Sequence, residues 1–277
     1  VNRMAHVRHF DRPVRLLADR GHEIVLASQD DDVELRGGLA GLARIMPLAG
    51  PRNRSDDWAR HAVTIRRARD YVRYLHPRYA AARQLGARGF EKLVSAVSGR
   101  TGDLGPEWSE LLLRLTKPEQ KRIDALLATI ETTIPIDPAI HAFVEGQHPD
   151  ALVVSPMVGL GSSQADFVKS ARRLGIPSAM LVFSWDNLSN KGMIHENPDR
   201  MIVWNDIQRH EAVKLHAYPA EQVAITGAPR FDAFFEMRPG TTRDEFCRMA
   251  RLDPSKPIVT YLCSSKFVAA HEQASVR

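Results

Sequence analysis

The stretch IPSAMLVFSWDNLSNKG, residues 176–192, predicts a buried strand followed by a polar loop. Its first half, IPSAMLVF, is a short apolar run after a proline, which is typical of a strand covered on both faces in a parallel sheet. Its second half brings two serines, a tryptophan, an acid, two amides, a lysine and a glycine. In open α/β sheets, ligands bind beyond the carboxyl ends of such strands. We therefore expect SWDNLSNKG, residues 184–192, to be a ligand-binding loop.

Strands and helices alternate on both sides of this stretch. Before it, HPDALVVSP (148–156) predicts a strand and residues 163–174 a helix. After it, DRMIVWN (199–205) and EQVAITG (221–227) predict strands on either side of a helix over 206–216. Because regular alternation of this kind gives a doubly wound parallel sheet, the predicted fold class is α/β with a Rossmann-like doubly wound parallel sheet.

The N-terminal half continues this pattern and adds an arginine-rich segment. A helix is expected to end at Gly21, because glycine adopts the left-handed conformation that follows many helices. This helix is expected over 7–20. The elements expected after it are strands at HEIVLAS (22–28) and ARIMPL (43–48), an arginine-rich helical segment over 56–97, an interruption at GRTGDLGPEW (99–108), and helices over 117–132 and 137–145.

The composition indicates an ordinary folded protein. Its 277 residues are 44% hydrophobic and 26% charged, and no stretch approaches the roughly 18 consecutive apolar residues of a membrane span. The 38 Lys plus Arg exceed the 33 Asp plus Glu, but the arginines are scattered through amphipathic helices. Nucleic acid is therefore not the expected partner. A membrane surface or a phosphate-bearing ligand would explain the excess of positive charge as well as nucleic acid would. Cys247 and Cys263 form no metal-spaced set, which favours a reducing cytoplasm.

Several common motifs are missing, and their absence narrows the chemistry. The sequence has no GxxxxGK[ST] phosphate loop, no HExxH and no paired cysteines, so no metal site is expected. The nearest approach to a dinucleotide fingerprint is GLGSS (159–163), which has only two of the glycines. The acidic run Asp30, Asp31 and Asp32 could hold a ribose, but solvated loop carboxylates are the simpler interpretation. NAD binding is therefore a minor alternative.

Both ends of the chain lead us to expect a fragment. The sequence opens directly into its first helix, whereas an α/β domain normally begins with a strand. At the other end, KPIVTYLCSSKFVAAHEQASVR (256–277) predicts a strand, a serine-rich loop and the start of a helix. We expect one domain over 1–232. Residues 233–277 would form a linker and the first strand, about Pro257 to Cys263, and first helix of an incomplete second domain.

Taken in order, these pieces resemble a known family. AHVRHFDRPVRLLADRGHEIVLAS (5–28) resembles the first helix and the following strand of GT-B-fold glycosyltransferases. SWDNLSNKG and then PDRMIVWNDIQRHEAVKLHAYPAEQVAITGAPRFD (198–232) resemble the same fold in bacterial surface-polysaccharide transferases and CDP-glycerol glycerophosphotransferase-like proteins. DPSKPIVTYLCSS (253–265) resembles the opening strand of the donor-side domain. The resemblance covers nearly the whole chain, and the order WDNL, WN, GAPRFD is its most specific feature.

The resemblance implies an acceptor-side domain over 1–232 and the beginning of a donor-side domain over 233–277. It implies transfer of a sugar or polyol phosphate from a UDP- or CDP-linked donor to an envelope polysaccharide or a glycolipid. The reaction would use no metal or cofactor and would take place in the cytoplasm or at the inner face of the plasma membrane. We expect this chain by itself to be inactive.

Two other functions suit the same architecture. A nucleotide-sugar 2-epimerase would act on a free nucleotide sugar and need no acceptor. A non-catalytic Rossmann-like module would bind a partner or an anionic surface, and the arginine-rich segment over 56–97 is the best support for it. Formation of an epimer from UDP-sugar alone would identify the epimerase. Flotation with liposomes of anionic lipid would test the binding module.

Three residues are expected to act in catalysis. Sugar transfer needs a base for the acceptor hydroxyl, and an imidazole with its ordinary pKa of about 6.5 accepts a proton at neutral pH. The resemblance assigns this role to His6, with His9 one turn along as a second choice. Asp186 would hold an acceptor hydroxyl or orient the histidine. The alternative for His6 is a surface histidine at the start of a helix.

The resemblance also implies substrate contacts, with Trp185 stacking on a sugar or acceptor and Arg230 meeting a phosphate. The alternatives are structural: a capped turn at Asp186 and Asn187, a helix cap at Asn205, and a linker role for Arg230. The expected substrate-binding residues are Ser184, Trp185, Asn187, Lys191, Asn205 and Arg230, and the expected donor-phosphate residues are Ser264 and Ser265.

Overall fold

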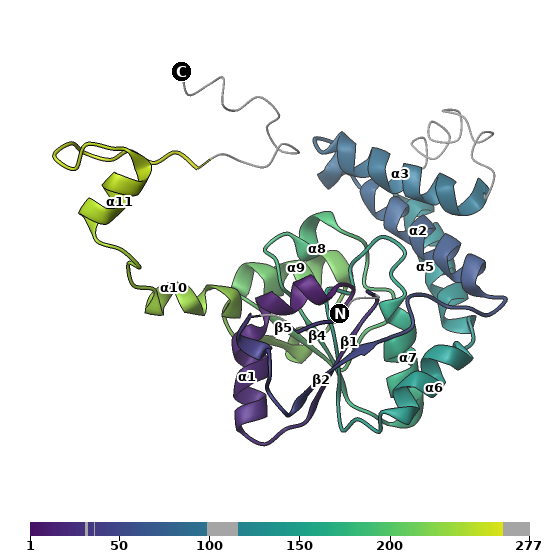
Figure 1. Ribbon diagram of the computed structural model, residues 1–277. Coiled ribbons are helices and arrows are strands. Elements are labelled where there is room, and N and C mark those ends of the chain that lie inside the picture. Colours follow the sequence, from purple (N-terminus) through teal and green to yellow (C-terminus); the bar gives the residue numbers. More distant parts are fainter. Residues whose placement is uncertain (31–32, 36, 99–115, 263–277) are drawn as a thin grey trace. The chain divides into compact units, whose positions relative to one another are not determined.

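The chain divides into two compact units, Val1–Asp232 and Ala233–Arg277. The computed structural model in Figure 1 describes residues 1–30, 33–35, 37–98 and 116–262. Each unit is described below by itself.

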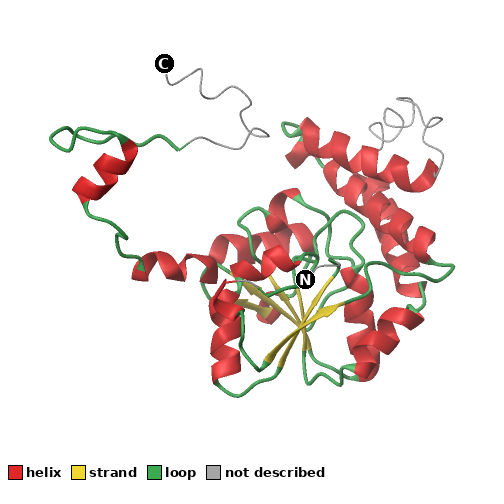
Figure 2. Ribbon diagram, in the orientation of Figure 1, coloured by secondary structure: helices red, strands yellow, loops and turns green. Residues whose placement is uncertain are grey.

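The first unit is an α/β structure in which helices flank parallel strands (Figures 1 and 2). Its strands are β1 (Ile24–Ser28), β2 (Ile45–Ala49), β3 (Leu152–Val154), β4 (Ser178–Leu181), β5 (Arg200–Val203) and β6 (Val223–Ile225). Its helices are α1 (Asp11–Asp19), α2 (Ala59–Tyr74), α3 (Arg83–Ser98), α5 (Lys117–Thr133), α6 (Pro138–Gly146), α7 (Gln164–Leu174), α8 (Asn187–Asn190), α9 (Asp206–His216) and the start of α10 (Asp232–Glu236). Short 3₁₀ turns are η1 (Met4–His9), η2 (Gly37–Leu39), η3 (Pro77–Tyr79), η4 (Ala220–Gln222) and η5 (Pro229–Phe231).

The strands form two parallel sheets, one of β1 and β2 and one in the order β3-β4-β5-β6. In the larger sheet Met180 of β4 lies opposite Met201 of β5, and both side chains are fully buried. Each crossover in this sheet passes through a helix, which a parallel connection requires. The predicted α/β class with parallel strands is confirmed, and the apolar run IPSAMLVF contains one of the central strands.

The predicted helix over 7–20 is wrong over residues 7–10 and is confirmed from Asp11 onward. The chain forms η1 as a 3₁₀ turn, leaves regular structure at Phe10, and starts α1 at Asp11. Pro13 gives the physical reason, because it has no N–H to donate to the carbonyl of His9, so an α-helix cannot run unbroken through both residues. This break gives η1 a direction of its own and places His6 and His9 on a separate short element.

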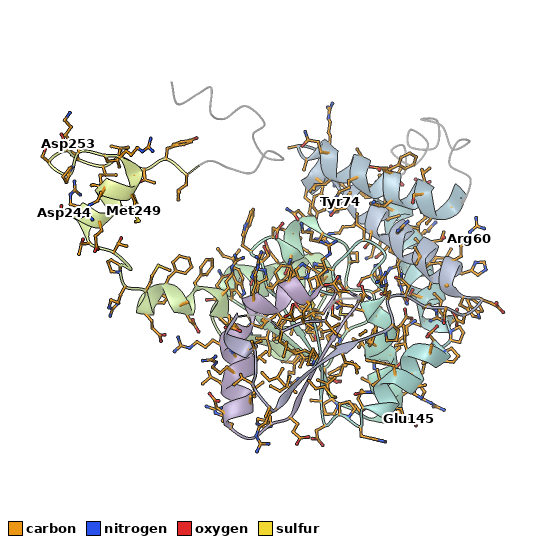
Figure 3. The ribbon with its side chains drawn as sticks, viewed as in Figure 1. Arg60, Tyr74, Glu145, Asp244, Met249 and Asp253 are labelled. Atoms are coloured by element: carbon orange, nitrogen blue, oxygen red, sulfur yellow. The ribbon has the colours of Figure 1, made fainter. Side chains whose placement is uncertain are left out.

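The arginine-rich segment over 56–97 forms α2 and α3, and together with α5 these helices make up what we call the arm. Helix α2 packs against both α3 and α5, and the three helices lie together at the upper right of Figures 1 and 2. Arg60 lies near the start of α2 and Tyr74 at its end (Figure 3). Gly89 of α3 permits the close approach, since a Cβ there would lie 3.2 Å from the Tyr74 ring.

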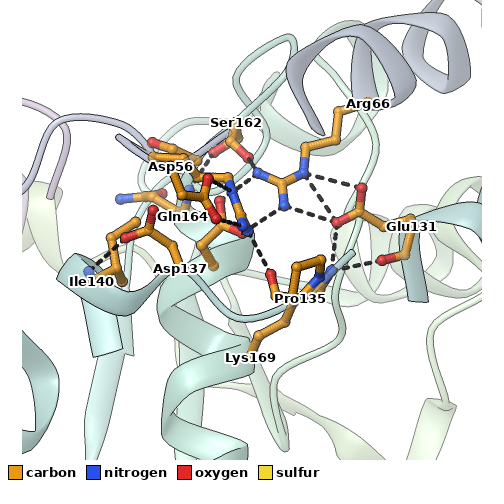
Figure 4. Close-up of polar contacts among 12 residues, drawn as sticks. Asp56, Arg66, Glu131, Pro135, Asp137, Ile140, Ser162, Gln164 and Lys169 are labelled. Atoms are coloured by element: carbon orange, nitrogen blue, oxygen red, sulfur yellow. Dashed lines mark hydrogen bonds and ion pairs between the residues drawn. The ribbon is translucent and has the colours of Figure 1, made fainter. Parts of the chain in front are cut away.

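The arm is joined to the sheet by a buried ionic network (Figure 4). The Arg66 guanidinium of α2 is fully buried and donates to both Glu131 of α5 and Asp166 of α7, with its shortest contact at 2.6 Å. Arg54 donates to Asp166 at 2.8 Å, and the Lys169 ammonium lies 2.9 Å from Glu131. Because each buried carboxylate meets two cations, the network is paired throughout, as buried charges must be.

The second unit contains the rest of α10 and one further helix, α11 (Arg243–Ala250), among its described residues. Thr242 and Glu245 form a capping box at the start of α11. The strand expected at about Pro257 to Cys263 is wrong for residues 257–262, which form no strand, while Cys263 lies outside the described residues. Val259 is 93% exposed, so its apolar side chain is not covered as it would be in a strand of a packed parallel sheet.

Candidate functional site

The histidines of η1 meet the loop that follows β4. The imidazoles of His6 and His9 both stack on the Phe183 ring, each with a centroid separation of 5.0 Å, and the two imidazoles lie 6.4 Å apart. Phe183 directly precedes the SWDNLSNKG loop. Residues separated by more than 170 positions are thus brought together at the carboxyl end of β4, which is where a parallel sheet places its ligands.

Both imidazoles of this histidine pair are held neutral. Burial lowers the pKa of His9 to about 4, and the positive charges of Arg230 and Arg8 add to the effect. Burial also lowers the pKa of His6, helped by Arg3, whereas the Asp30 carboxylate opposes the shift. The His6 ring is half-buried, and its Nδ1 has no hydrogen-bond partner among the described residues. His6 is therefore held as a neutral imidazole, which is the protonation state that a general base requires, and its unpaired Nδ1 is itself buried.

Polar side chains of the SWDNLSNKG loop bind one another. The Ser184 hydroxyl donates to Asp186 at 2.6 Å, and the Lys191 ammonium lies 3.1 Å from the same carboxylate. Burial raises the pKa of Asp186, but these two partners outweigh it and hold that pKa below its usual value. Asp186 is consequently an ionised, paired carboxylate, which is suited to accepting a hydrogen bond and poorly suited to removing a proton.

The loop buries one of its predicted binding residues and exposes another. Asn187 is 2% exposed, and its Oδ1 accepts from the backbone N–H groups of Phe183 and Ser184 at 3.1 Å each. This is the capped turn that was the structural alternative in the sequence. Trp185 is 72% exposed at the surface of the loop. An indole exposed to this extent contributes little to the core and leaves its face available for stacking.

The loop is tied to the turn after β5 by a residue that sequence reasoning missed. Gln208 donates from Nε2 to the Ser184 carbonyl at 3.1 Å and accepts from the Trp204 N–H at 2.8 Å. Asn205 caps α9, since its Oδ1 accepts from the Gln208 N–H at 3.0 Å. Trp204 donates its indole N–H to the Val182 carbonyl at 2.9 Å. The position of Gln208 in the first turn of α9 was the only sequence signal for its role.

The turn after β6 brings Arg230 to the histidine pair. Its guanidinium lies 5.2 Å from the centroid of the Phe231 ring, and its charge contributes to the lowered pKa of His9. Phe231 also packs edge-on against Trp204, with centroids 5.8 Å apart. The GAPRF segment is thus a neighbour of η1 through η5, and it also contacts Trp204 of the WN pair. Arg230 is exposed and supplies a positive charge at this edge of the sheet.

A cavity of about 830 Å³ lies beside η1. Met4, Ala5, Val7 and Arg8 line it from this turn, whereas His6 and His9 stack on Phe183 instead. Asp30 ties the cavity to the site, because its carboxylate accepts from the Met4 N–H at 2.7 Å and acts on the pKa of His6. The remaining lining residues are Asp11, Gln29, Glu34, Leu35, Gly37, Gly38, Leu39 and Arg52.

Several arginines of the arm are committed to intramolecular contacts. Arg60 and Arg67 donate to the carbonyls of Val97 and Lys92, and Arg69 pairs with Asp124. These contacts weaken the argument that the segment over 56–97 presents its guanidinium groups to an anionic surface.

The described part of the chain contains no helix long and apolar enough to cross a membrane. Within the same residues, no group of three or more His, Cys, Asp or Glu side chains is placed to hold a metal ion. Ser264 and Ser265, the predicted donor-phosphate residues, lie outside the described residues.

Comparison with known proteins adds no relative, since no family model, no curated protein and no solved structure matches the chain.

Proposed function

We propose that the chain is the acceptor-side part of a GT-B-like glycosyltransferase. It would serve the transfer of a sugar or polyol phosphate from a UDP- or CDP-linked donor to an envelope polysaccharide or a glycolipid. The observation that carries this proposal is the stacking of the neutral His6 and His9 imidazoles on Phe183, which directly precedes the loop that carries the exposed Trp185. The likeness of the WDNL, WN and GAPRFD segments to such transferases supplies the reaction type.

In this mechanism His6 takes the proton of the acceptor hydroxyl. With a sugar donor, the acceptor oxygen then attacks the anomeric carbon, and the bond from that carbon to the diphosphate oxygen breaks. With a polyol-phosphate donor, it attacks the phosphorus that carries the polyol, and the phosphoanhydride bond breaks to release the nucleoside monophosphate. His6 suits the role better than His9, because the His9 pKa of about 4 makes it a weak base and its ring is only 8% exposed. A general base whose pKa lies near the working pH combines the required neutral form with useful basicity.

The other groups of the site would bind and orient. Trp185 offers an aromatic face to a sugar ring. Asp186 and Lys191 form a paired carboxylate and ammonium to which acceptor hydroxyls can bond. Arg230 supplies a positive charge where the donor diphosphate would leave, and the cavity beside η1 has the volume for part of an acceptor.

The test uses the protein expressed from its complete reading frame, with UDP- and CDP-linked donors and a cell-envelope extract as acceptor. Release of nucleotide is measured for the wild type, for His6→Ala, and for His22→Ala as a control at an exposed histidine outside the site. We expect His6→Ala to lower turnover by about 10²- to 10⁴-fold with donor binding unchanged, and His22→Ala to behave as the wild type. Equal turnover in all three proteins, or no nucleotide release from any donor, would contradict the proposal. Formation of an epimer from donor alone would favour the epimerase.

A further inference from the structure

The carbonyl groups of the SWDNLSNKG loop bind side chains of the arm. Arg73 of α2 donates from Nη1 to the carbonyls of Lys191 at 3.0 Å and Gly192 at 2.9 Å, and from Nη2 to those of Leu188 at 2.5 Å and Ser189 at 3.4 Å. The Asn190 carbonyl accepts from Arg88 of α3, and the Lys191 carbonyl accepts from the Tyr74 hydroxyl as well as from Arg73. Every carbonyl over 188–192 therefore accepts a hydrogen bond from the arm.

These contacts satisfy groups that the loop cannot satisfy by itself. Helix α8 is only four residues long, so its last carbonyls have no partner within the helix. A cation at the carboxyl end of a helix also interacts favourably with the helix dipole. A guanidinium has five N–H donors in a fixed plane and can serve several carbonyls at once, which an ammonium on a flexible chain does less well. Arg73 is thus matched to this turn in both charge and geometry.

The same face of α2 holds a second loop. Asp70 lies three and four residues before Arg73 and Tyr74, a spacing that places the three side chains on one side of the helix. The buried Asp70 carboxylate accepts from the N–H of Gly161, in the loop after β3, at 2.7 Å and from that of Met193 at 2.6 Å. Helix α2 therefore ties the end of the SWDNLSNKG loop to the neighbouring loop of the sheet.

The other end of this face is fixed to the core. One turn before Asp70, Arg66 donates to Glu131 and Asp166 in the buried ionic network (Figure 4). The face of α2 is thus anchored to α5 and α7 at Arg66 and to the loop at Arg73. A helix held in this way transmits its position to the loop, since both contacts depend on one rigid element.

We propose that Arg73 is the positioning residue of the SWDNLSNKG loop and that the arm, through it, sets the placement of Trp185 and Asp186. Arg73 acts on the loop through its backbone carbonyls. The effect on transfer rests on the proposed function, whereas the effect on the loop does not.

Hydrogen exchange in the whole protein tests the effect on the loop. The amides to follow are those of Asn190, Gly192 and Met193, which donate to Asp186, Val158 and Asp70 respectively. Because hydrogen bonds from a charged donor are stronger than those between neutral groups, Arg73→Ala should speed exchange over 184–193 by about tenfold or more while β4 and β5 stay protected. Arg73→Lys should fall between Arg73→Ala and the wild type.

Arg60→Ala is the matched control, because Arg60 lies on the same helix and donates to the Val97 carbonyl, away from the loop. Exchange over 184–193 should be unchanged in this variant. The proposal is overturned if Arg73→Ala exchanges as Arg60→Ala does, or if its exchange rises equally throughout β4 and β5, since that would show general destabilisation. If Arg73→Ala does not fold, Arg73→Lys, which keeps the charge and the length, is compared with Arg60→Ala instead, and its exchange over 184–193 should be the faster of the two.

Steady-state kinetics separate this inference from the proposed function. A misplaced loop should lower kcat by about 10²-fold and leave the donor KM unchanged, because small displacements of positioned groups have effects of this size. Faster loop exchange with unchanged transfer would support the positioning role and contradict a part for the loop in catalysis. If the wild type shows no transfer, the proposed function fails and the exchange comparison alone decides the role of Arg73.

Discussion

Replacing Arg66 by alanine should be among the most destabilising changes in the first unit. Every N–H of its guanidinium has a buried acceptor: Nε donates to Glu131, Nη1 to Asp166 and the Ser162 carbonyl, and Nη2 to Glu131 and Asp166. The side chain is 1% exposed. Removing one partner of a buried ion pair typically costs about 3–5 kcal/mol, because the remaining charge stays buried without compensation.

The expected value lies toward the lower end of that range. After Arg66→Ala, Asp166 keeps Arg54 at 2.8 Å and Glu131 keeps Lys169 at 2.9 Å, so neither carboxylate is left alone. We therefore expect a loss of about 3 kcal/mol from a total stability of about 5–15 kcal/mol. With a urea m-value of about 3 kcal/mol/M, the midpoint of unfolding falls by about 1 M.

The assay is urea unfolding followed by circular dichroism, with two further variants for comparison. Arg60→Ala removes an exposed arginine from the same helix and should change stability by no more than about 0.5 kcal/mol. Arg66→Lys keeps the charge but lacks the planar fork, so it should recover only part of the loss. The reasoning is refuted if the midpoint of Arg66→Ala matches that of Arg60→Ala.

Acid unfolding gives an independent check of the same network. Burial raises the pKa of Asp166, but hydrogen bonds and charge from Arg66 and Arg54 outweigh it and hold that pKa below its usual value of 3.8. A carboxylate with a depressed pKa contributes stability that is present above the ordinary pKa and is lost as the pH falls through the folded-state value. Arg66→Ala should therefore weaken the fall in stability below about pH 4.

Three smaller changes test other parts of the structure. Gly192→Ala should destabilise by about 1–3 kcal/mol, because its Cβ would lie 2.8 Å from the Asp70 carboxylate and 2.9 Å from a backbone carbonyl. Gly146→Ala is the control and should be neutral or stabilising, because no atom lies within 4 Å of its Cβ. Similar melting temperatures for the two variants would contradict this prediction. Asn205→Ala should lose about 1 kcal/mol of stability through the cap of α9, with Asn205→Asp retaining most of it in thermal unfolding. The pKa of His9 is lowered to about 4, so between pH 6.5 and pH 4 the unfolded chain takes up a proton that the folded chain does not, and stability should fall as the pH drops through this range. His9→Phe should flatten this dependence of stability on pH. An unchanged dependence would show that the imidazole is not neutral in the folded protein.

The parts of the site that the sequence predicted are those encoded by local pattern. The loop after β4 follows from the apolar run that ends at Phe183, and the expected helix over 206–216 has the bounds of α9, with Asn205 supplying its cap. The break at Phe10 was missed although Pro13 carries its signal, because the apolar spacing of the segment continues through it.

The sequence by itself determined the α/β class, the parallel strands and the polar loop beyond β4, because burial on both faces and helical periodicity are properties of short segments. Only the tertiary structure decided which arginines lie inside. Arg66 and Arg73 stand in an arginine-rich amphipathic helix, where the simplest expectation is a solvated charge. Their partners lie far along the chain: Asp166 is 100 residues from Arg66, and Lys191 is 118 residues from Arg73. No local pattern encodes such a pairing, since it exists only after the sheet has placed the α7 helix and the loop after β4 against the arm.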